Sequence, residues 1–290
     1  MAKADPDLVA RLEEKAIDIG KQLCDMTYHI GHAHVGGSLS MCDFTVALYY
    51  HYLNFDPKDL KNPDRDRLIL SKGHNGCLIY NIFADLGMYT KEFLYNGYNK
   101  IDGKFGQHPN RLYIPGFEAS TGSLGHGLSI AIGAAHSGRM EKRNYRVFCI
   151  LGDGELQEGS NWEAIMFAAH HKYGNLVAIV DKNGIQGNNF TSETINMEPL
   201  AERWKAFGWD VIEIENGNDM EQVVEAFESL PPSDSQVRRP PICMIFNTLK
   251  GCGIDFMENE PKWHAGGLDE ETLNECKLMI EQNRRSRRER

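Results

Sequence analysis

The sequence lacks several features that would assign it to a specialised class of protein. Its N-terminus has no basic segment followed by an apolar one, and no apolar run approaches the length that crosses a membrane. Its seven cysteines are an odd number and form no Cys-x-x-Cys pair. Cysteine usage of this kind fits a reduced protein, so we expect a cytoplasmic location and no membrane partner.

The sequence also contains fewer basic residues than acidic ones. The chain has 31 Lys and Arg residues against 41 Asp and Glu residues, which gives a formal net charge of -10. General binders of nucleic acid or anionic membranes need a basic surface, so we expect no nucleic-acid partner. The exception is the arginine-rich segment Arg284–Arg290. We interpret it as a solvated terminus, with a contact to an acidic partner as the alternative.

The remaining composition is that of an ordinary folded protein. The 290 residues are 41% hydrophobic and 25% charged, with 28 glycines and 11 prolines. This profile excludes a disordered or fibrous chain, and the length suits one large domain or two small ones.

Two apolar runs indicate the fold class. Residues 146–151 and 176–180 are almost continuously apolar, and a helical pattern at 160–173 separates them. Such a βαβ unit predicts an α/β fold in which a parallel sheet carries helices on both faces. We expect further helices at 8–30, 41–53, 76–86, 123–135, 200–207 and 220–230, and further strands at 66–70, 210–214 and 242–248.

Polar residues follow both of these apolar strands. The first leads into Gly152-Asp153-Gly154 and the second into Asp181-Lys182-Asn183-Gly184. Ligands of open parallel sheets bind beyond the carboxyl ends of the strands, where neighbouring strands would bring the Asp153 carboxylate and the Asn183 amide oxygen together. Oxygen ligands suit Mg²⁺ or Ca²⁺, and the glycines permit close approach of a phosphate. An ordinary strand-end turn with a surface asparagine is the alternative.

These segments, with Leu156-Gln157-Glu158-Gly159 and Ile185, resemble the thiamine-diphosphate signature of the transketolase family. Five further segments match that family in the same order: His34-Val35-Gly36-Gly37, Ser71-Lys72-Gly73-His74, Gln107-His108-Pro109, Ser120-Thr121-Gly122-Ser123-Leu124-Gly125 and His264-Ala265-Gly266. The resemblance covers roughly residues 8–268. It implies a thiamine-diphosphate (diphosphate-domain) fold over 1–268, followed by a C-terminal helix and the arginine-rich tail at 269–290.

The resemblance also implies roles for individual residues. Asp153, Asn183 and the backbone carbonyl of Ile185 are expected to hold Mg²⁺, or Ca²⁺ or Mn²⁺ in its place. Four histidines are expected to be catalytic: His74 and His264 beside the diphosphate and the reacting carbon, and His34 and His108 at hydroxyls of the sugar. Gly122 and Leu124 are expected to face the aminopyrimidine ring, and the Gly154 amide and Asn183 the diphosphate. The chain departs from the family at His126, where glutamine is common.

The family's activating glutamate lies in a second α/β domain, which has no counterpart in this sequence. Glu155 and Glu158 are not substitutes, because they open a helix on the diphosphate side, and Glu158 matches a family residue at the subunit interface. We therefore expect a complementary C-terminal transketolase subunit to supply that glutamate and the sugar-phosphate contacts, with two copies of each chain (α2β2).

The expected reaction is transfer of a two-carbon ketol unit from a ketose phosphate to an aldose phosphate, as in the pentose phosphate pathway. Alternatives within the cofactor class are a split transketolase specialised for an unusual ketose phosphate or sulfonate, the α chain of a 2-oxoacid dehydrogenase, and a relative of deoxyxylulose-phosphate synthase. A non-catalytic α/β scaffold is the alternative from a different class.

Overall fold

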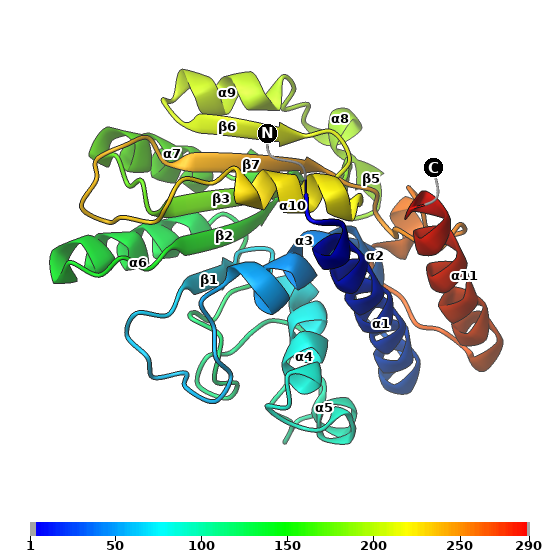
Figure 1. Cartoon of the computed structure of the whole chain (residues 1–290). Coiled ribbons are helices and arrows are strands. Elements are labelled where there is room, and N and C mark those ends of the chain that lie inside the picture. Colours follow the sequence, from blue (N-terminus) through cyan, green and yellow to red (C-terminus); the bar gives the residue numbers. More distant parts are fainter. Residues whose placement is uncertain (1–3, 289–290) are drawn as a thin grey trace.

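The computed structural model describes the backbone of residues 4–288 and the side chains of residues 4–284. A five-stranded sheet forms its centre, with strand order β1-β2-β3-β7-β6 and every neighbouring pair parallel (Figure 1). The strands are β1 (Arg67–Leu70), β2 (Val147–Gly152), β3 (Leu176–Lys182), β6 (Asp210–Ile214) and β7 (Ile242–Asn247). The α/β fold predicted from the two apolar runs is confirmed.

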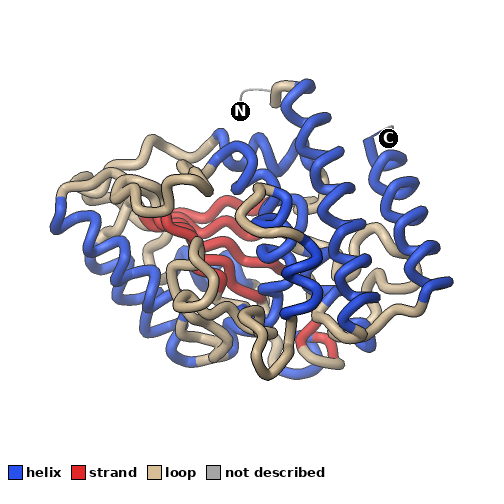
Figure 2. Tube along the Cα trace, turned by 90° about the horizontal axis from the view of Figure 1, so that it is seen from below, coloured by secondary structure: helices blue, strands red, loops and turns tan. Residues whose placement is uncertain are grey.

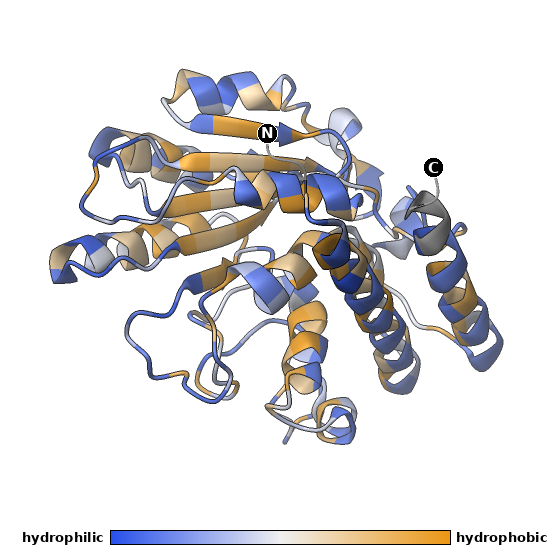
Figure 3. Ribbon diagram, in the orientation of Figure 1, coloured by the Kyte–Doolittle hydropathy of each residue, from blue (hydrophilic) through white to orange (hydrophobic). Residues whose placement is uncertain are grey.

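Helices cover both faces of this sheet (Figure 2). Side chains that alternate along β2 enter different cores, since Phe148 and Ile150 belong to one apolar cluster and Cys149 and Leu151 to the other. The first cluster includes residues of α1 (Pro6–Ile30), α3 (Cys42–Ala47), α4 (Gly76–Asp85), α10 (Met220–Glu228) and α11 (Glu270–Arg288). The second includes residues of α6 (Gly127–Glu141), α7 (Gly159–His171) and α9 (Leu200–Ala206). Burial on both faces explains why β2 and residues 176–180 of β3 are continuously apolar rather than alternating (Figure 3).

Several short elements complete the fold. They are α2 (Val35–Ser40), α5 (Lys91–Gly97), α8 (Thr191–Thr194), the two-stranded pair β4 (Ile185–Gln186) and β5 (Asn189–Phe190), and 3-10 turns at Gly73–Asn75, Gly154–Gln157 and Pro261–His264. The sequence patterns did not predict these elements, because each is too short to show a hydrophobic period.

Two predicted helices were placed wrongly. The helix expected to begin at Ser123 begins at Gly127, because Gly122 (φ +140°) and Gly125 (φ +88°) hold the preceding segment in conformations that a helix does not use. The helix expected at 41–53 is divided, since α3 ends at Ala47 and a π-helical turn follows at Leu48–Tyr52. In this turn the backbone hydrogen bond from Leu53 to Leu48 spans five residues instead of four, which interrupts the α-helix.

Arg284 also corrects the prediction of a solvated tail. The structure places Arg284 on α11 with its side chain buried, in an ion pair with Asp43 of α3. Asn218 donates a second hydrogen bond to the same carboxylate at 2.9 Å. Helix α11 lies beside α1 (Figure 1), and two further ion pairs, Lys21–Glu281 and Lys277–Asp25, join these two helices. The side chains of the remaining tail residues lie outside the described part of the chain.

All seven cysteines lie within the described residues, where they are buried and form no disulfide. Across the described residues, the helices are too short or too polar to span a lipid bilayer.

The buried pair predicts that Arg284→Met lowers the free energy of unfolding by roughly 3 to 5 kcal/mol, because the substitution leaves the Asp43 carboxylate buried without its charge partner. Urea unfolding followed by circular dichroism measures the change. Lys277→Met, which breaks a partly exposed pair with Asp25, is the control and costs less than about 1 kcal/mol. Equal effects of the two substitutions would contradict this account of α11.

Candidate active site

A cavity of about 470 Å³ opens at the carboxyl ends of the central strands. Every predicted site residue lines it, namely His34, His74, His108, Gly122, Leu124, Asp153, Gly154, Asn183, Ile185 and His264. These residues come from separate segments of the chain, and the parallel sheet gathers them at one edge.

The pairing of β2 with β3 brings the predicted metal ligands together. Gly152 lies opposite Asp181 in the register of the two strands, so that Asp153 and Asn183 follow neighbouring strand ends. The Asp153 carboxylate accepts hydrogen bonds from the backbone amides of Gly154 (2.9 Å) and Gly184 (2.8 Å). Burial, with the nearby Asp181 carboxylate, raises the pKa of Asp153 to about 6.

Three of the predicted histidines form a cluster. The ring centroid of His34 lies 5.1 Å from that of His74 and 5.2 Å from that of His264, and the last two are 5.5 Å apart. Burial lowers the pKa of His34 to about 4, of His74 to about 2 and of His264 to about 3, and neighbouring cations add to each effect. The three imidazoles are therefore neutral at pH 7 and can each donate one hydrogen bond and accept another.

His108 lies against Gly122. A Cβ atom at Gly122 would stand 2.7 Å from the His108 ring, so only glycine lets the ring approach the backbone this closely. The other histidines near the site lie outside the cavity lining. His32 is exposed, with its ring centroid 6.5 Å from that of His34, and His126 is exposed at the start of α6.

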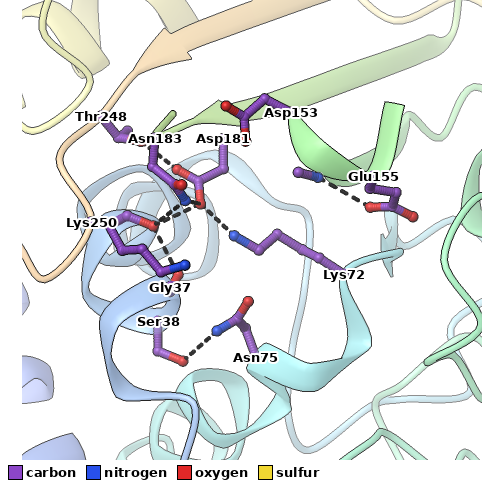
Figure 4. Close-up of polar contacts among 12 residues, drawn as sticks. Gly37, Ser38, Lys72, Asn75, Asp153, Glu155, Asp181, Asn183, Thr248 and Lys250 are labelled. Atoms are coloured by element: carbon purple, nitrogen blue, oxygen red, sulfur yellow. Dashed lines mark hydrogen bonds and ion pairs between the residues drawn. The ribbon is translucent and has the colours of Figure 1, made fainter. Parts of the chain in front are cut away.

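Two lysines in the cavity wall were missed by the sequence patterns. Lys72 is buried and forms an ion pair with Asp181 (Figure 4). Lys250 lies with Nζ 2.9 Å from Nδ1 of His264 and 3.4 Å from the carbonyl oxygen of Ile185. Burial, followed by repulsion from Lys72, lowers the pKa of Lys250 to about 8. Lys72 stands inside the Ser-Lys-Gly-His segment, which was a usable signal. No sequence signal pointed to Lys250, because only the folded chain brings this residue next to His264.

Glu155 lies in the first turn of the 3-10 helix Gly154–Gln157, so it opens a short helix at the cavity as expected. Its buried carboxylate accepts hydrogen bonds from the amides of Gly125 (3.0 Å) and Gly152 (3.1 Å) and from the Ser71 hydroxyl. These contacts join the loop after β1, the loop before α6 and the end of β2. Glu158 lines the rim of the cavity.

Neutral imidazoles, two ammonium groups and a strand-end carboxylate beside an amide suit a phosphorylated ligand bound with a divalent cation. Comparison with known proteins agrees with this class of site. The family model described as transketolase, thiamine diphosphate binding domain, matches residues 12–285. The chain therefore belongs to the transketolase family.

Individual relatives show the same likeness. An apulose-4-phosphate transketolase subunit from Actinobacillus succinogenes is 40% identical over 254 residues, which are 87% of this chain and 90% of the relative. The 6-deoxy-6-sulfo-D-fructose transketolase subunit SqwG of a Clostridium species is 36% identical over 260 residues, 90% and 92% of the two chains. The transketolase structure from Campylobacter jejuni superposes with a TM-score of 0.84 at 29% identity, covering 96% of this chain and 43% of that chain.

The neutral histidines predict a loss of stability in acid. An unfolded histidine titrates near 6.5 whereas the folded His74 has a pKa of about 2, so between these values the unfolded state binds protons that the folded state does not. The free energy of unfolding should thus fall as the pH drops below about 6.5, and His74→Asn should flatten the fall. Urea titrations at a series of pH values test this. His51→Asn, at an exposed position, is the control and should leave the slope unchanged. An unaltered slope for His74→Asn would show that the buried imidazole does not cause the effect.

Proposed function

We propose that this chain is the thiamine-diphosphate-binding subunit of a split transketolase and carries a ketol unit from a ketose to an aldose together with a second chain. The observation that supports this best is the convergence of all ten predicted site residues on one cavity of a transketolase-family fold. A non-catalytic scaffold would not account for the family match and the histidine cluster together, and neither would the α chain of a 2-oxoacid dehydrogenase.

The donor set fits Mg²⁺. In the described part of the chain, no three His, Cys, Asp or Glu side chains gather as a metal cluster. The available oxygens are instead the Asp153 carboxylate, the Asn183 amide and the Ile185 carbonyl, a small set of hard donors that leaves coordination positions for phosphate oxygens and water. We assign the metal to these three groups, with Ca²⁺ or Mn²⁺ as substitutes.

The cavity wall also fits a diphosphate. A Cβ atom at Gly154 would lie 2.5 Å from Cβ of Gln186, so only glycine fits where this backbone lines the cavity. Lys72 and Lys250 bring positive charge to this part of an acidic protein. We assign the diphosphate to His74, His264, Asn183 and the Gly154 amide, and the aminopyrimidine to Gly122 and Leu124.

When bound, thiamine diphosphate would supply a nucleophilic carbon and an electron sink for cleavage of a carbon–carbon bond. The chain's own histidines orient the sugar. The Nδ1 atom of His34 is buried without a hydrogen-bond partner, which suits a group that meets a substrate hydroxyl. His108, held against Gly122, completes the wall on the sugar side, and neutral imidazoles at both places can exchange protons with hydroxyl oxygens.

This assignment calls for a complementary subunit. Among the described residues of the cavity, the Glu155 carboxylate is engaged with two backbone amides and a serine hydroxyl, so it is not free to meet a pyrimidine nitrogen. Two relatives that match almost along their whole length are named as subunits, and the chain spans less than half of a solved transketolase. We infer a C-terminal partner that supplies the activating glutamate, in an α2β2 assembly.

The relatives also favour a specialised substrate. Their names specify apulose 4-phosphate and 6-deoxy-6-sulfo-D-fructose as substrates of those proteins, each a ketose with an anionic end group. For this chain we propose a ketose phosphate or sulfonate as donor and an aldose phosphate as acceptor, with the xylulose 5-phosphate and ribose 5-phosphate pair of the pentose phosphate pathway as the reference reaction.

Reconstitution tests the proposal. The purified chain alone should show no ketol transfer, and addition of the complementary subunit, Mg²⁺ and thiamine diphosphate should restore it with at least one of the named donors. In the complex, Asp153→Ala should lower kcat/KM by a factor of about 100 or more, equivalent to about 2.7 kcal/mol of transition-state stabilisation.

Asp210→Ala, an exposed carboxylate at the start of β6, is the matched control and should retain wild-type kcat/KM. Robust activity of the isolated chain would overturn the requirement for a second chain, and full cofactor-dependent activity of Asp153→Ala would overturn the metal assignment.

A further inference from the structure

One carboxylate at the site lies behind the cavity rather than in its wall. The Asp181 side chain is 0% exposed and yet meets four hydrogen-bond donors (Figure 4). Its Oδ2 atom contacts the Lys72 ammonium, the Ser40 hydroxyl at 2.7 Å and the Asn183 Nδ2 atom at 3.0 Å. Its Oδ1 atom accepts from the Thr248 hydroxyl. A buried ionised carboxylate needs partners of this kind, and here they come from the ends of α2, β1, β3 and β7.

The contact with Asn183 fixes the direction of its amide. An ionised carboxylate only accepts hydrogen bonds, so the Asn183 Nδ2 group must face Asp181. The Oδ1 atom then lies on the other side, where it accepts from the backbone N–H of Ile185 at 3.1 Å. If the amide were turned by 180°, its oxygen would face the Asp181 carboxylate and its NH₂ group would face the backbone N–H of Ile185. Only the observed direction leaves an oxygen for a cation.

The contact with Lys72 places a positive charge in the cavity wall. Lys72 is 3% exposed, and without Asp181 its ammonium would be a buried charge lacking a partner. The Oδ2 atom of Asp181 therefore orients the Asn183 amide, whose oxygen is a proposed metal ligand. It also holds the Lys72 ammonium group, which is proposed to lie beside the diphosphate. The carboxylate itself is absent from the residues that line the cavity.

We propose that Asp181 is a positioning residue that orients the Asn183 amide oxygen toward the divalent metal and holds Lys72 beside the diphosphate. The proposal rests on the function proposed above and adds a residue behind the ligands to it. Asp181 acts through Asn183 and has no contact of its own with the cofactor.

The test measures metal binding instead of catalysis. The probe is Mn²⁺ titrated into the reconstituted complex in the presence of thiamine diphosphate, with free Mn²⁺ followed by electron paramagnetic resonance. Asp181→Ala should raise the dissociation constant of Mn²⁺ about 10- to 100-fold, the usual loss when a partner of a metal ligand is removed. Thr248→Val removes a contact from the opposite oxygen of the same carboxylate. It should stay within about threefold of wild type, because the contact between Asp181 and Asn183 remains.

A double-mutant cycle separates positioning from a general structural role. If Asp181 acts through Asn183, the variant D181A/N183A binds Mn²⁺ no more than about twofold more weakly than N183A alone. Losses that multiply, or wild-type affinity in D181A, would overturn the proposal.

A second pair of variants covers a failure of D181A to fold. K72M/D181L replaces the ion pair by apolar groups of similar size, and it should bind Mn²⁺ at least about tenfold more weakly than K72M, in which Asp181 still orients Asn183. Equal affinities of the two would contradict the positioning role. Wild-type complex that binds no Mn²⁺ with thiamine diphosphate would instead contradict the proposed function, so the two failures are distinguishable.

Discussion

The ion pair between Asp181 and Lys72 is the contact on which the arrangement of the site depends. It lies in the interior, where two charges are tolerated only with full hydrogen bonding, and the Ser40, Asn183 and Thr248 side chains provide that bonding. Because the partners come from the ends of different elements, satisfying one carboxylate fixes the relative positions of the loops that follow β1, β3 and β7. Lys72 and His74 belong to the segment after β1, the proposed metal ligands Asn183 and Ile185 to the segment after β3, and Lys250 to the segment after β7.

The same constraint explains how an acidic chain can bind a phosphorylated cofactor. With a net charge of -10, its surface as a whole does not attract phosphate. Lys72 and Lys250 give the cavity a local positive potential, and burial strengthens their interaction with an anion by lowering the local dielectric constant. Lys250 contacts both His264 and the Ile185 carbonyl, so the proposed diphosphate and metal positions share this charged group.

Sequence patterns predicted the central strands of the sheet, but they did not predict the conformations of the loops or the contacts between distant segments. The strands β2 and β3 were found because both faces of each are buried, which leaves a continuous apolar run, and the polar residues after them were found because parallel strands end at one edge. Gly125 was misread as part of a helix, since a positive φ value does not alter the hydrophobic period. Arg284 was misread as solvated, because a partner such as Asp43, 241 positions away, is invisible to local pattern. The role of Asp181 was equally hidden, as it depends on four segments that meet only in the folded chain.

The most direct test of this account is a crystal structure of the chain with its complementary subunit, thiamine diphosphate and Mn²⁺, in which the anomalous signal of manganese locates the metal. We predict a single peak per site, roughly 2.0–2.6 Å from the Asp153 carboxylate, the Asn183 amide oxygen and the Ile185 carbonyl, with Asp181 on the far side of Asn183. A metal bound elsewhere in the cavity, or a diphosphate held without these three oxygens, would contradict it.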